Sequence, residues 1–177
     1  MSEHMALENL TVLDLTRVLA GPFSTMMLAD MGANVIKIEV PKGGDDTRSY
    51  PPFRAENLNG ERESVYFANI NRNKKGITLN LKAPEGKEIF KELVKKADIV
   101  VENYRPGVMD KLGLGYDVLK EINPRIIYAA VSGFGCYGPY HLRPGYDILA
   151  QAMGGMMSIT GSKGGEPTRA GSALGDI

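Results

Sequence analysis

The sequence contains little cysteine or histidine and no tryptophan. A single cysteine, Cys136, cannot form an internal disulfide, and two histidines with one cysteine cannot supply a standard zinc site. We therefore expect no bound metal, and a reducing, cytoplasmic environment suits the chain. The 21 basic and 21 acidic residues balance, which gives no electrostatic reason to expect nucleic acid or an anionic membrane surface as a partner.

Long apolar runs are also missing, since no segment approaches the roughly 20 residues that a membrane-spanning helix needs. The first residues lack the basic stretch followed by an apolar one that marks a signal peptide. We therefore expect a soluble protein. With 177 residues, 43% of them apolar, the chain is long enough for one globular domain with a buried core.

Apolar runs alternate with helical patterns along the chain, which is typical of βαβ units and a mainly parallel sheet. The predicted strands are residues 10–15, 34–39, 76–81, 98–102 and 125–131, and the predicted helices are residues 22–31 and 84–97. The last two strands are almost entirely apolar, so we expect both of their faces to be covered. Residues 40–64, rich in glycine, proline and charge, are predicted to have little regular structure. The predicted fold class is α/β, a Rossmann-like open sheet with flanking helices.

The segments that follow the predicted strands are rich in glycine, proline, arginine and lysine. They are residues 16–22, 40–48, 82, 103–107 and 132–139. Ligands of open α/β sheets bind beyond the carboxyl ends of the strands. Backbone amides combined with cationic side chains favour phosphate groups. The sequence therefore predicts a phosphate-bearing ligand at this edge of the sheet.

Other patterns in these segments give only weak indications of a function. The stretch GFGCYG fits the dinucleotide-binding motif GxGxxG, but Pro139 and Pro144 prevent a helix from starting directly after it. Cys136 could be a nucleophile with His141 as its base, although a lone loop cysteine is usually structural. Ser132 and Ser172 are poor candidates for a hydrolase nucleophile because the chain has no GxSxG motif.

Seven sequence blocks, in order and spacing, resemble the N-terminal half of the family III CoA-transferases, also called the CaiB/BaiF family. This family includes formyl-CoA:oxalate and carnitine CoA-transferases. The resemblance covers the chain from about residue 7 to residue 176, and the blocks read LTVLDLTRVLAGPFSTMMLADMGANVIKIE, GGDDTR, NRNKKGITLNLKAPEG, ADIVVENYRPGVMDKLGLGYD, NPRIIYAAVSGFGCYGP, PGYDILAQAMGG and GSALGD.

The resemblance implies the first part of an interlocked-dimer CoA-transferase fold. Residues 1–177 would form the N-terminal part of the large, Rossmann-like, CoA-binding domain. A second, small domain and a C-terminal return to the first domain would lie outside this sequence. We expect an interlocked homodimer for the full-length protein, and we expect the 177-residue chain by itself to be inactive or poorly folded.

The resemblance also assigns roles to individual residues. It implies that Asp176, the acid of the GD motif, is the catalytic nucleophile. The CoA-binding residues that it implies are Leu19, Ala20, Lys42, Leu79, Lys82, Asn103, Tyr104, Arg105, Lys111, Arg143, Tyr146 and Asp147. Two positions depart from the oxalate enzymes: Leu19 replaces a glutamine, and Val40 replaces an arginine, which leaves Lys42 as the nearest cation.

The activity that the resemblance implies is transfer of CoA from an acyl-CoA thioester to a carboxylic acid through an aspartyl-CoA thioester. Coenzyme A would be a substrate, with no permanently bound cofactor. One alternative is an α-methylacyl-CoA racemase, but Tyr146 stands where racemases have a histidine. Another is a non-catalytic fragment that binds a nucleotide or CoA. Without the other blocks, Asp176 would read as an ordinary turn or cap residue.

Overall fold

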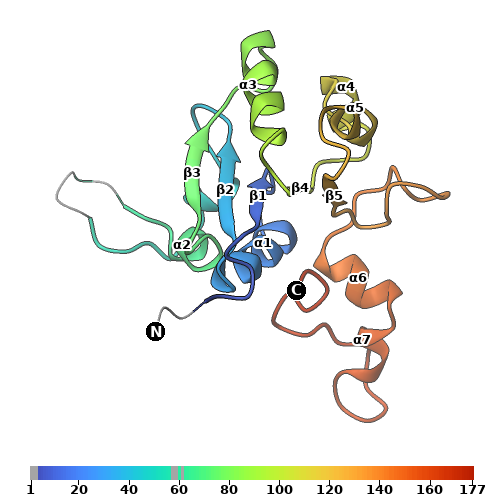
Figure 1. Ribbon diagram of the computed structural model, residues 1–177. Helices are drawn as coiled ribbons and strands as arrows, with labels where there is room; N and C mark the ends of the chain where they lie inside the picture. The colour runs from blue at the N-terminus through green and yellow to red at the C-terminus, as the bar shows by residue number, and fades with distance from the viewer. Residues whose placement is uncertain (1–3, 57–59, 61) are drawn as a thin grey trace. The chain divides into compact units, whose positions relative to one another are not determined.

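The computed structural model describes residues 4–56, 60 and 62–177. The chain divides into two compact units, one ending at Val131 and the other comprising Ser132–Ile177 (Figure 1). Each unit is described separately below.

A five-stranded sheet forms the centre of the first unit. Its strands are β1 (Thr11–Asp14), β2 (Asn34–Glu39), β3 (Lys75–Thr78), β4 (Ile99–Glu102) and β5 (Ile127–Ala130). Their spatial order is β3-β2-β1-β4-β5, and every neighbouring pair is parallel. This confirms the predicted Rossmann-like sheet. The strand order reverses between β1 and β4, the point at which sheets of this type bind their ligands.

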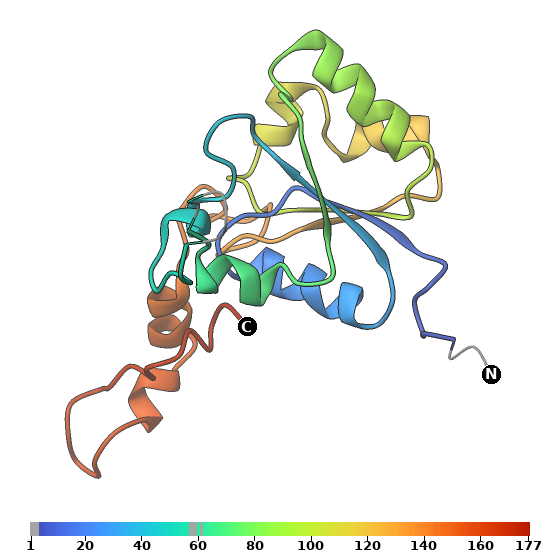
Figure 2. The same cartoon turned by 90° about the vertical axis from the view of Figure 1, so that its left-hand side faces the viewer.

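Helices cover both faces of this sheet, as Figure 2 shows. Helices α1 (Ala20–Asp30) and α2 (Val65–Ile70) lie on one face, and helices α3 (Pro84–Val94), α4 (Val108–Leu112) and α5 (Tyr116–Ile122) lie on the other. A short 3₁₀ helix, η1, spans Asp46–Ser49 within the segment that follows β2.

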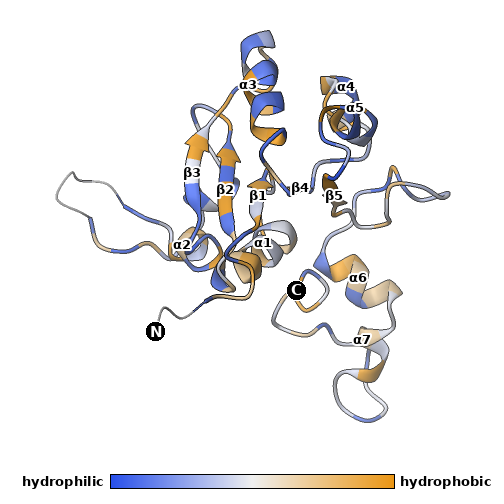
Figure 3. Cartoon of the chain, in the orientation of Figure 1, coloured by the Kyte–Doolittle hydropathy of each residue, from blue (hydrophilic) through white to orange (hydrophobic). Residues whose placement is uncertain are grey.

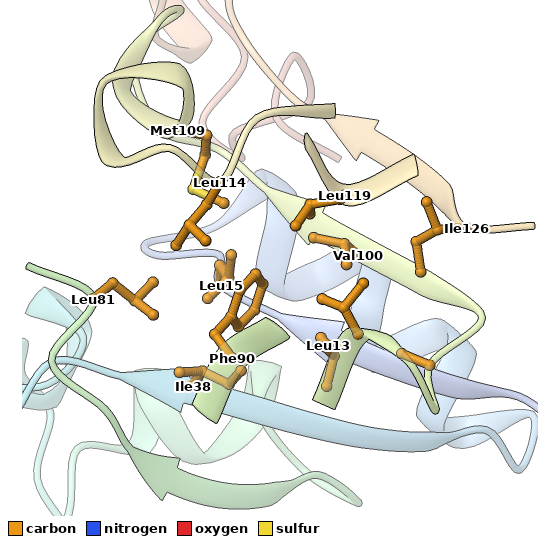
Figure 4. Close-up of a cluster of buried hydrophobic side chains, with 12 residues drawn as sticks. Leu13, Leu15, Ile38, Leu81, Phe90, Val100, Met109, Leu114, Leu119 and Ile126 are labelled. Atoms are coloured by element: carbon orange, nitrogen blue, oxygen red, sulfur yellow. The ribbon is translucent and has the colours of Figure 1, made fainter. Parts of the chain in front are cut away.

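The two faces of the sheet hold separate hydrophobic clusters because successive strand residues point to opposite sides. Leu13 and Val100 join the larger cluster with Phe90 of α3 (Figure 4). Their neighbours Val12 and Val101 join the smaller cluster on the α1 face. The hydropathy colouring shows the same pattern, with apolar strands and a two-sided α3 (Figure 3).

Several predicted boundaries move in the structure. Helix α1 begins at Ala20, two residues before Pro22, and β3 ends at Thr78 rather than at Leu81. Helix α2 was not predicted; its N-cap is Ser64, whose side chain accepts a hydrogen bond from the amide of Phe67.

Strand β5 is less covered than its apolar sequence predicted. It forms an edge of the described sheet, so Ile127 remains 60% exposed. Tyr128 and Ala129 still pack against the two clusters, one on each face. The prediction that both faces are covered is therefore wrong for the two end residues of β5. Only β4 lies beside β5 in the described sheet, so fewer neighbouring side chains shield these residues.

The second unit contains a loop, residues 132–146, followed by α6 (Asp147–Met153) and α7 (Met156–Ile159). The loop is closed at its base by two glycines: a Cβ added to Gly133 would lie 2.3 Å from the Cα of Gly145. Neither glycine could carry a side chain in this arrangement.

No helix in the described part of the chain is long and apolar enough to cross a membrane. Among the same residues, no three histidine, cysteine, aspartate or glutamate side chains are grouped as a metal site requires.

Candidate active site

The loop after β1 is held in place from two neighbouring strands. The side chain of Asn103, which follows β4, accepts a hydrogen bond from the Arg17 amide at 2.8 Å and donates one to the Arg17 carbonyl at 2.6 Å. Asp45, which follows β2, accepts a hydrogen bond from the Val18 amide at 3.2 Å. Val18 has a φ of 67°, a costly conformation for a β-branched residue. The surrounding hydrogen bonds therefore impose the backbone path that leads to Leu19 and Ala20.

Two buried lysines stabilise this loop through hydrogen bonds and ion pairs. Lys37 of β2 donates to the carbonyl of Thr16 at 2.9 Å and pairs with Asp45 at 3.0 Å. Lys74 pairs with Asp14 at 3.0 Å, and burial lowers the pKa of Lys74 to about 8. All four of these charged side chains are at most 2% exposed. They are committed to the structure of the loop rather than to a ligand.

The exposed cations near the carboxyl edge of the sheet fall into two groups. Arg17 makes hydrogen bonds of 2.7 Å to both carboxylate oxygens of Asp46, and Arg48 bonds both oxygens of Glu39 at 2.7 Å. Within the described ranges, no ion pair engages the four cations that the sequence predicted as CoA ligands in this unit. These are Lys42, Lys82, Arg105 and Lys111, all exposed. They are the cations that remain available to phosphate groups.

The remaining candidates of the first unit are partly structural. Leu79 packs against the larger hydrophobic cluster, and its amide donates to the carbonyl of Glu39 at 2.9 Å. Tyr104 also packs against this cluster, and burial raises the pKa of its hydroxyl. The Tyr104 amide donates to the carboxylate of Glu102 at 2.7 Å. Asn103, which follows β4, is thus hydrogen-bonded to Arg17 in the loop that leads to Leu19 and Ala20, at the point where the strand order reverses.

In the second unit, Asp176 lies in a turn of small residues and is partly buried. Its amide donates to the carbonyl of Ala173 at 3.1 Å. Burial raises the pKa of the Asp176 carboxyl, and the neighbouring Asp147 carboxylate raises it further. A carboxylate in this setting is less stabilised than one in water, which favours its use as a nucleophile.

Asp147, predicted as a CoA contact, makes hydrogen bonds within its own unit. Both of its carboxylate oxygens accept hydrogen bonds from Gln151 Nε2, at 3.0 and 2.9 Å, and Oδ1 also accepts the Gly175 amide at 2.8 Å. The bonds from Gln151 hold the pKa of Asp147 below its ordinary value, with a smaller contribution from Gly175. Gln151 was not among the predicted site residues, although its spacing of four residues from Asp147 places both on one face of a helix.

The other candidates of this unit lie on or next to its loop. Arg143 stacks over the ring of Tyr140, with 4.2 Å between its guanidinium carbon and the ring centroid. Tyr146 is 68% exposed. No helix follows Gly138 before α6 begins at Asp147, so the structure lacks the helix start that a dinucleotide-binding motif requires.

Comparison with known proteins identifies the group to which these features belong. The family model described as CoA-transferase family III matches residues 7–177. A succinyl-CoA:glutarate CoA-transferase from Mus musculus is 52% identical over 172 residues, which cover 97% of this chain and 38% of that protein. An acetyl-CoA:oxalate CoA-transferase from Acetobacter aceti is 51% identical over 171 residues, which cover 96% of this chain and 42% of that protein.

The solved structures give the same result. A CAIB/BAIF family protein from Brucella suis superposes with a TM-score of 0.92 and 46% identity, over 99% of this chain and 46% of that protein. The chain spans less than half of the length of each of these three relatives. The match extends through both units and includes the turn that carries Asp176. The chain belongs to the family III CoA-transferases.

Proposed function

We propose that the complete protein carrying this chain transfers CoA from an acyl-CoA thioester to a free carboxylic acid, with Asp176 as the nucleophile. The observation that carries the proposal is the partly buried Asp176 carboxyl, whose pKa is raised, at the GD motif of a family III chain. Relatives named for succinyl-CoA, acetyl-CoA, glutarate and oxalate support small acids as donors and acceptors.

In the proposed first half-reaction, the Asp176 carboxylate attacks the thioester carbonyl and expels CoA thiolate, which leaves a mixed anhydride. The thiolate then attacks the aspartyl carbon of the anhydride. This step releases the donor acid and forms an aspartyl-CoA thioester. Covalent catalysis of this kind divides one difficult exchange into easier steps.

In the second half-reaction, the acceptor carboxylate attacks the aspartyl-CoA thioester and again forms an anhydride and a thiolate. The thiolate attacks the acyl carbon of the acceptor, which gives the new acyl-CoA and frees Asp176. One thioester is made for each one broken, so the exchange needs no external energy source. The raised pKa of Asp176 supports this role because a less stabilised carboxylate is a stronger nucleophile.

We propose that CoA binds at the carboxyl edge of the parallel sheet. The free cations Lys42, Lys82, Arg105 and Lys111 would receive its phosphates. The loop at Leu19 and Ala20 would contact the ligand through its fixed backbone, as ligands do at a switch point. Arg143 and Tyr146, both exposed, are proposed as further contacts. A homodimer is proposed for the complete protein, by the family resemblance alone.

The racemase alternative receives less support. Its chemistry needs a histidine and an aspartate that exchange a proton with the α-carbon. Tyr146 occupies the position of that histidine, and Nδ1 of His141, on the same loop, donates a hydrogen bond to the carbonyl of Gly138 at 2.7 Å.

The experiment that tests the transferase proposal incubates the complete protein with succinyl-CoA, acetyl-CoA or formyl-CoA and then with hydroxylamine, followed by peptide mass mapping. We expect a hydroxamate at Asp176, and none in the Asp176→Asn variant. Asp117→Asn is the matched control because the Asp117 side chain is 89% exposed on α5. A modification at another residue, or one that survives Asp176→Asn, would contradict the proposal.

A further inference from the structure

Gln151 is a buried amide in a helix whose other side chains are largely exposed. It is the only glutamine of the chain and is 1% exposed. On the same helix, α6, Ile148 and Met153 are 49% and 60% exposed. Burying an amide costs free energy unless its hydrogen bonds are made, whereas burying an apolar side chain is favourable. The burial of a glutamine here therefore points to what its hydrogen bonds hold in place.

The side chain of Gln151 contacts the segment before Asp176 at two backbone positions. Its Oε1 accepts a hydrogen bond from the Ala170 amide at 2.8 Å, and its Nε2 donates to the Ser172 carbonyl at 3.2 Å. Both ends of the amide are thus used. A side chain with one end free could tolerate a shift of this segment, but a fully satisfied one fixes a single arrangement.

The same Nε2 also holds Asp147, which extends the contact to the residue next to Asp176. Nε2 bonds both carboxylate oxygens of Asp147, whose Oδ1 accepts the Gly175 amide at 2.8 Å. Gly175 packs closely enough that an added Cβ would lie 2.7 Å from the Cβ of Ala150. Segment 170–175 is therefore joined to α6 at three backbone positions, all through Gln151 directly or through the carboxylate that it orients.

We propose that Gln151 is a positioning residue for the reaction at Asp176: its amide fixes segment 170–175 against α6 and so sets where the nucleophilic carboxylate lies. This inference rests on the proposed function for its catalytic consequence, but the fixing of the segment stands on the contacts alone. The hydrogen bonds of the Gln151 side chain go to Asp147, Ala170 and Ser172 and not to Asp176, so Gln151 acts on the carboxylate through the segment.

The first test compares Gln151→Met with the wild-type complete protein. Methionine keeps much of the shape and loses every hydrogen bond. We expect the rate of aspartyl-adduct formation at saturating acyl-CoA to fall by about 10- to 100-fold, the cost of misplacing a catalytic group by up to 1 Å. The Kd for CoA, measured by calorimetry, should stay within about twofold because the proposed phosphate contacts are unaffected.

Asn123→Leu is the matched control. Its amide is also partly buried and bonds backbone carbonyls, those of Val94 and Ala97, at 3.0 and 2.8 Å, in the first unit. A loss of stability alone should lower the melting temperature of both variants. Only Gln151→Met should lower the adduct rate of the folded protein. An adduct rate equal to that of Asn123→Leu would overturn the proposal.

A second measurement separates this inference from the proposed function. Amide hydrogen exchange at Ala170 and Gly175 should accelerate at least about tenfold in Gln151→Met, since each amide loses its acceptor or the group that orients it. Unchanged exchange at both amides would overturn the positioning role whatever the chemistry. A wild-type protein that forms no adduct at Asp176 would instead overturn the proposed function, and the exchange rates would still decide the role of Gln151.

Discussion

Gly175 leaves no room for a methyl group, so replacing it with alanine should displace the turn that carries Asp176. An added Cβ would lie 2.7 Å from the Cβ of Ala150, 3.1 Å from the carbonyl oxygen of Asp147 and 3.2 Å from its Oδ1. The backbone of Gly175 does not have a positive φ. The penalty therefore comes from contact with α6 and not from backbone conformation.

The size of the effect follows from these distances. Non-bonded carbon atoms attract best at about 3.5–4.0 Å, so the 2.7 Å contact must lengthen by about 1 Å. A displacement of this size in a catalytic group can cost about 100-fold in rate. We expect the Gly175→Ala variant to form the aspartyl adduct about 100-fold more slowly than wild type, measured by quenched-flow mass spectrometry of the complete protein.

The chain offers both a control and a rescue. Gly171→Ala makes the same change four residues earlier, where an added Cβ would meet nothing within 4 Å. Its adduct rate should stay near that of wild type. Adding Ala150→Gly to Gly175→Ala removes the closest clashing atom and should restore part of the rate, although a glycine within α6 costs about 1 kcal/mol of helix stability. Equal rates in Gly175→Ala and Gly171→Ala would refute the reasoning.

Three further predictions concern the site and its supports. Asn103→Ala removes two hydrogen bonds to Arg17, each worth about 1 kcal/mol, so calorimetry should show CoA binding weakened by up to about 30-fold; unchanged affinity would show that the loop keeps its position without them. In the proposed reaction Asp176 must be ionised to attack. Because its pKa is raised, adduct formation should decline, as the pH is lowered, at a higher pH than for an ordinary aspartate. Asp147→Asn removes a charge that raises this pKa and should move the midpoint of the pH–rate profile downward, whereas a fixed midpoint would contradict the role of that charge. Burial lowers the pKa of Lys74 from 10.5 to about 8, so between these values the unfolded chain holds a proton that the folded chain has lost, and the free energy of unfolding should rise with pH. In urea titrations the Lys74→Met variant should lack this rise in the free energy of unfolding with pH. A rise as steep as that of the wild type would contradict its assignment to Lys74.

The sheet was predictable where apolar residues were dense. Strand β2 has the predicted bounds, 34–39, and α3 begins at the predicted Pro84. Both elements have strong local signals, three β-branched apolar residues in a short strand and a proline at the first helical position. Helix α2 was missed because it opens with valine, tyrosine and phenylalanine, residues that favour strands, and its only local signal is the Ser64 cap.

The sequence allowed us to predict which loops form the candidate site, but not which side chains in them contact each other. Periodicity indicates the strands and therefore the glycine- and lysine-rich segments at their carboxyl ends, but the switch point needs the spatial strand order, which only the structure gives. Periodicity does not indicate which polar side chains bond each other. The hydrogen bonds that Asn103 and Asp147 make within the protein were therefore not predicted, and their contacts with a ligand stay a prediction. Gln151 gave no signal of its own because a glutamine is usually exposed.

The pair Gly133 and Gly145 has a consequence for how this protein can change over evolution. The backbones of these two glycines are in close contact, so the chain enters and leaves the loop between them at nearly the same point. Residues 134–144 can therefore lengthen, shorten or be exchanged without moving α6 or the turn that carries Asp176. Related proteins should vary in the length of this loop and keep glycine at both of its ends. The sequence of this loop is thus free to diversify while Asp176, the proposed nucleophile, keeps its place.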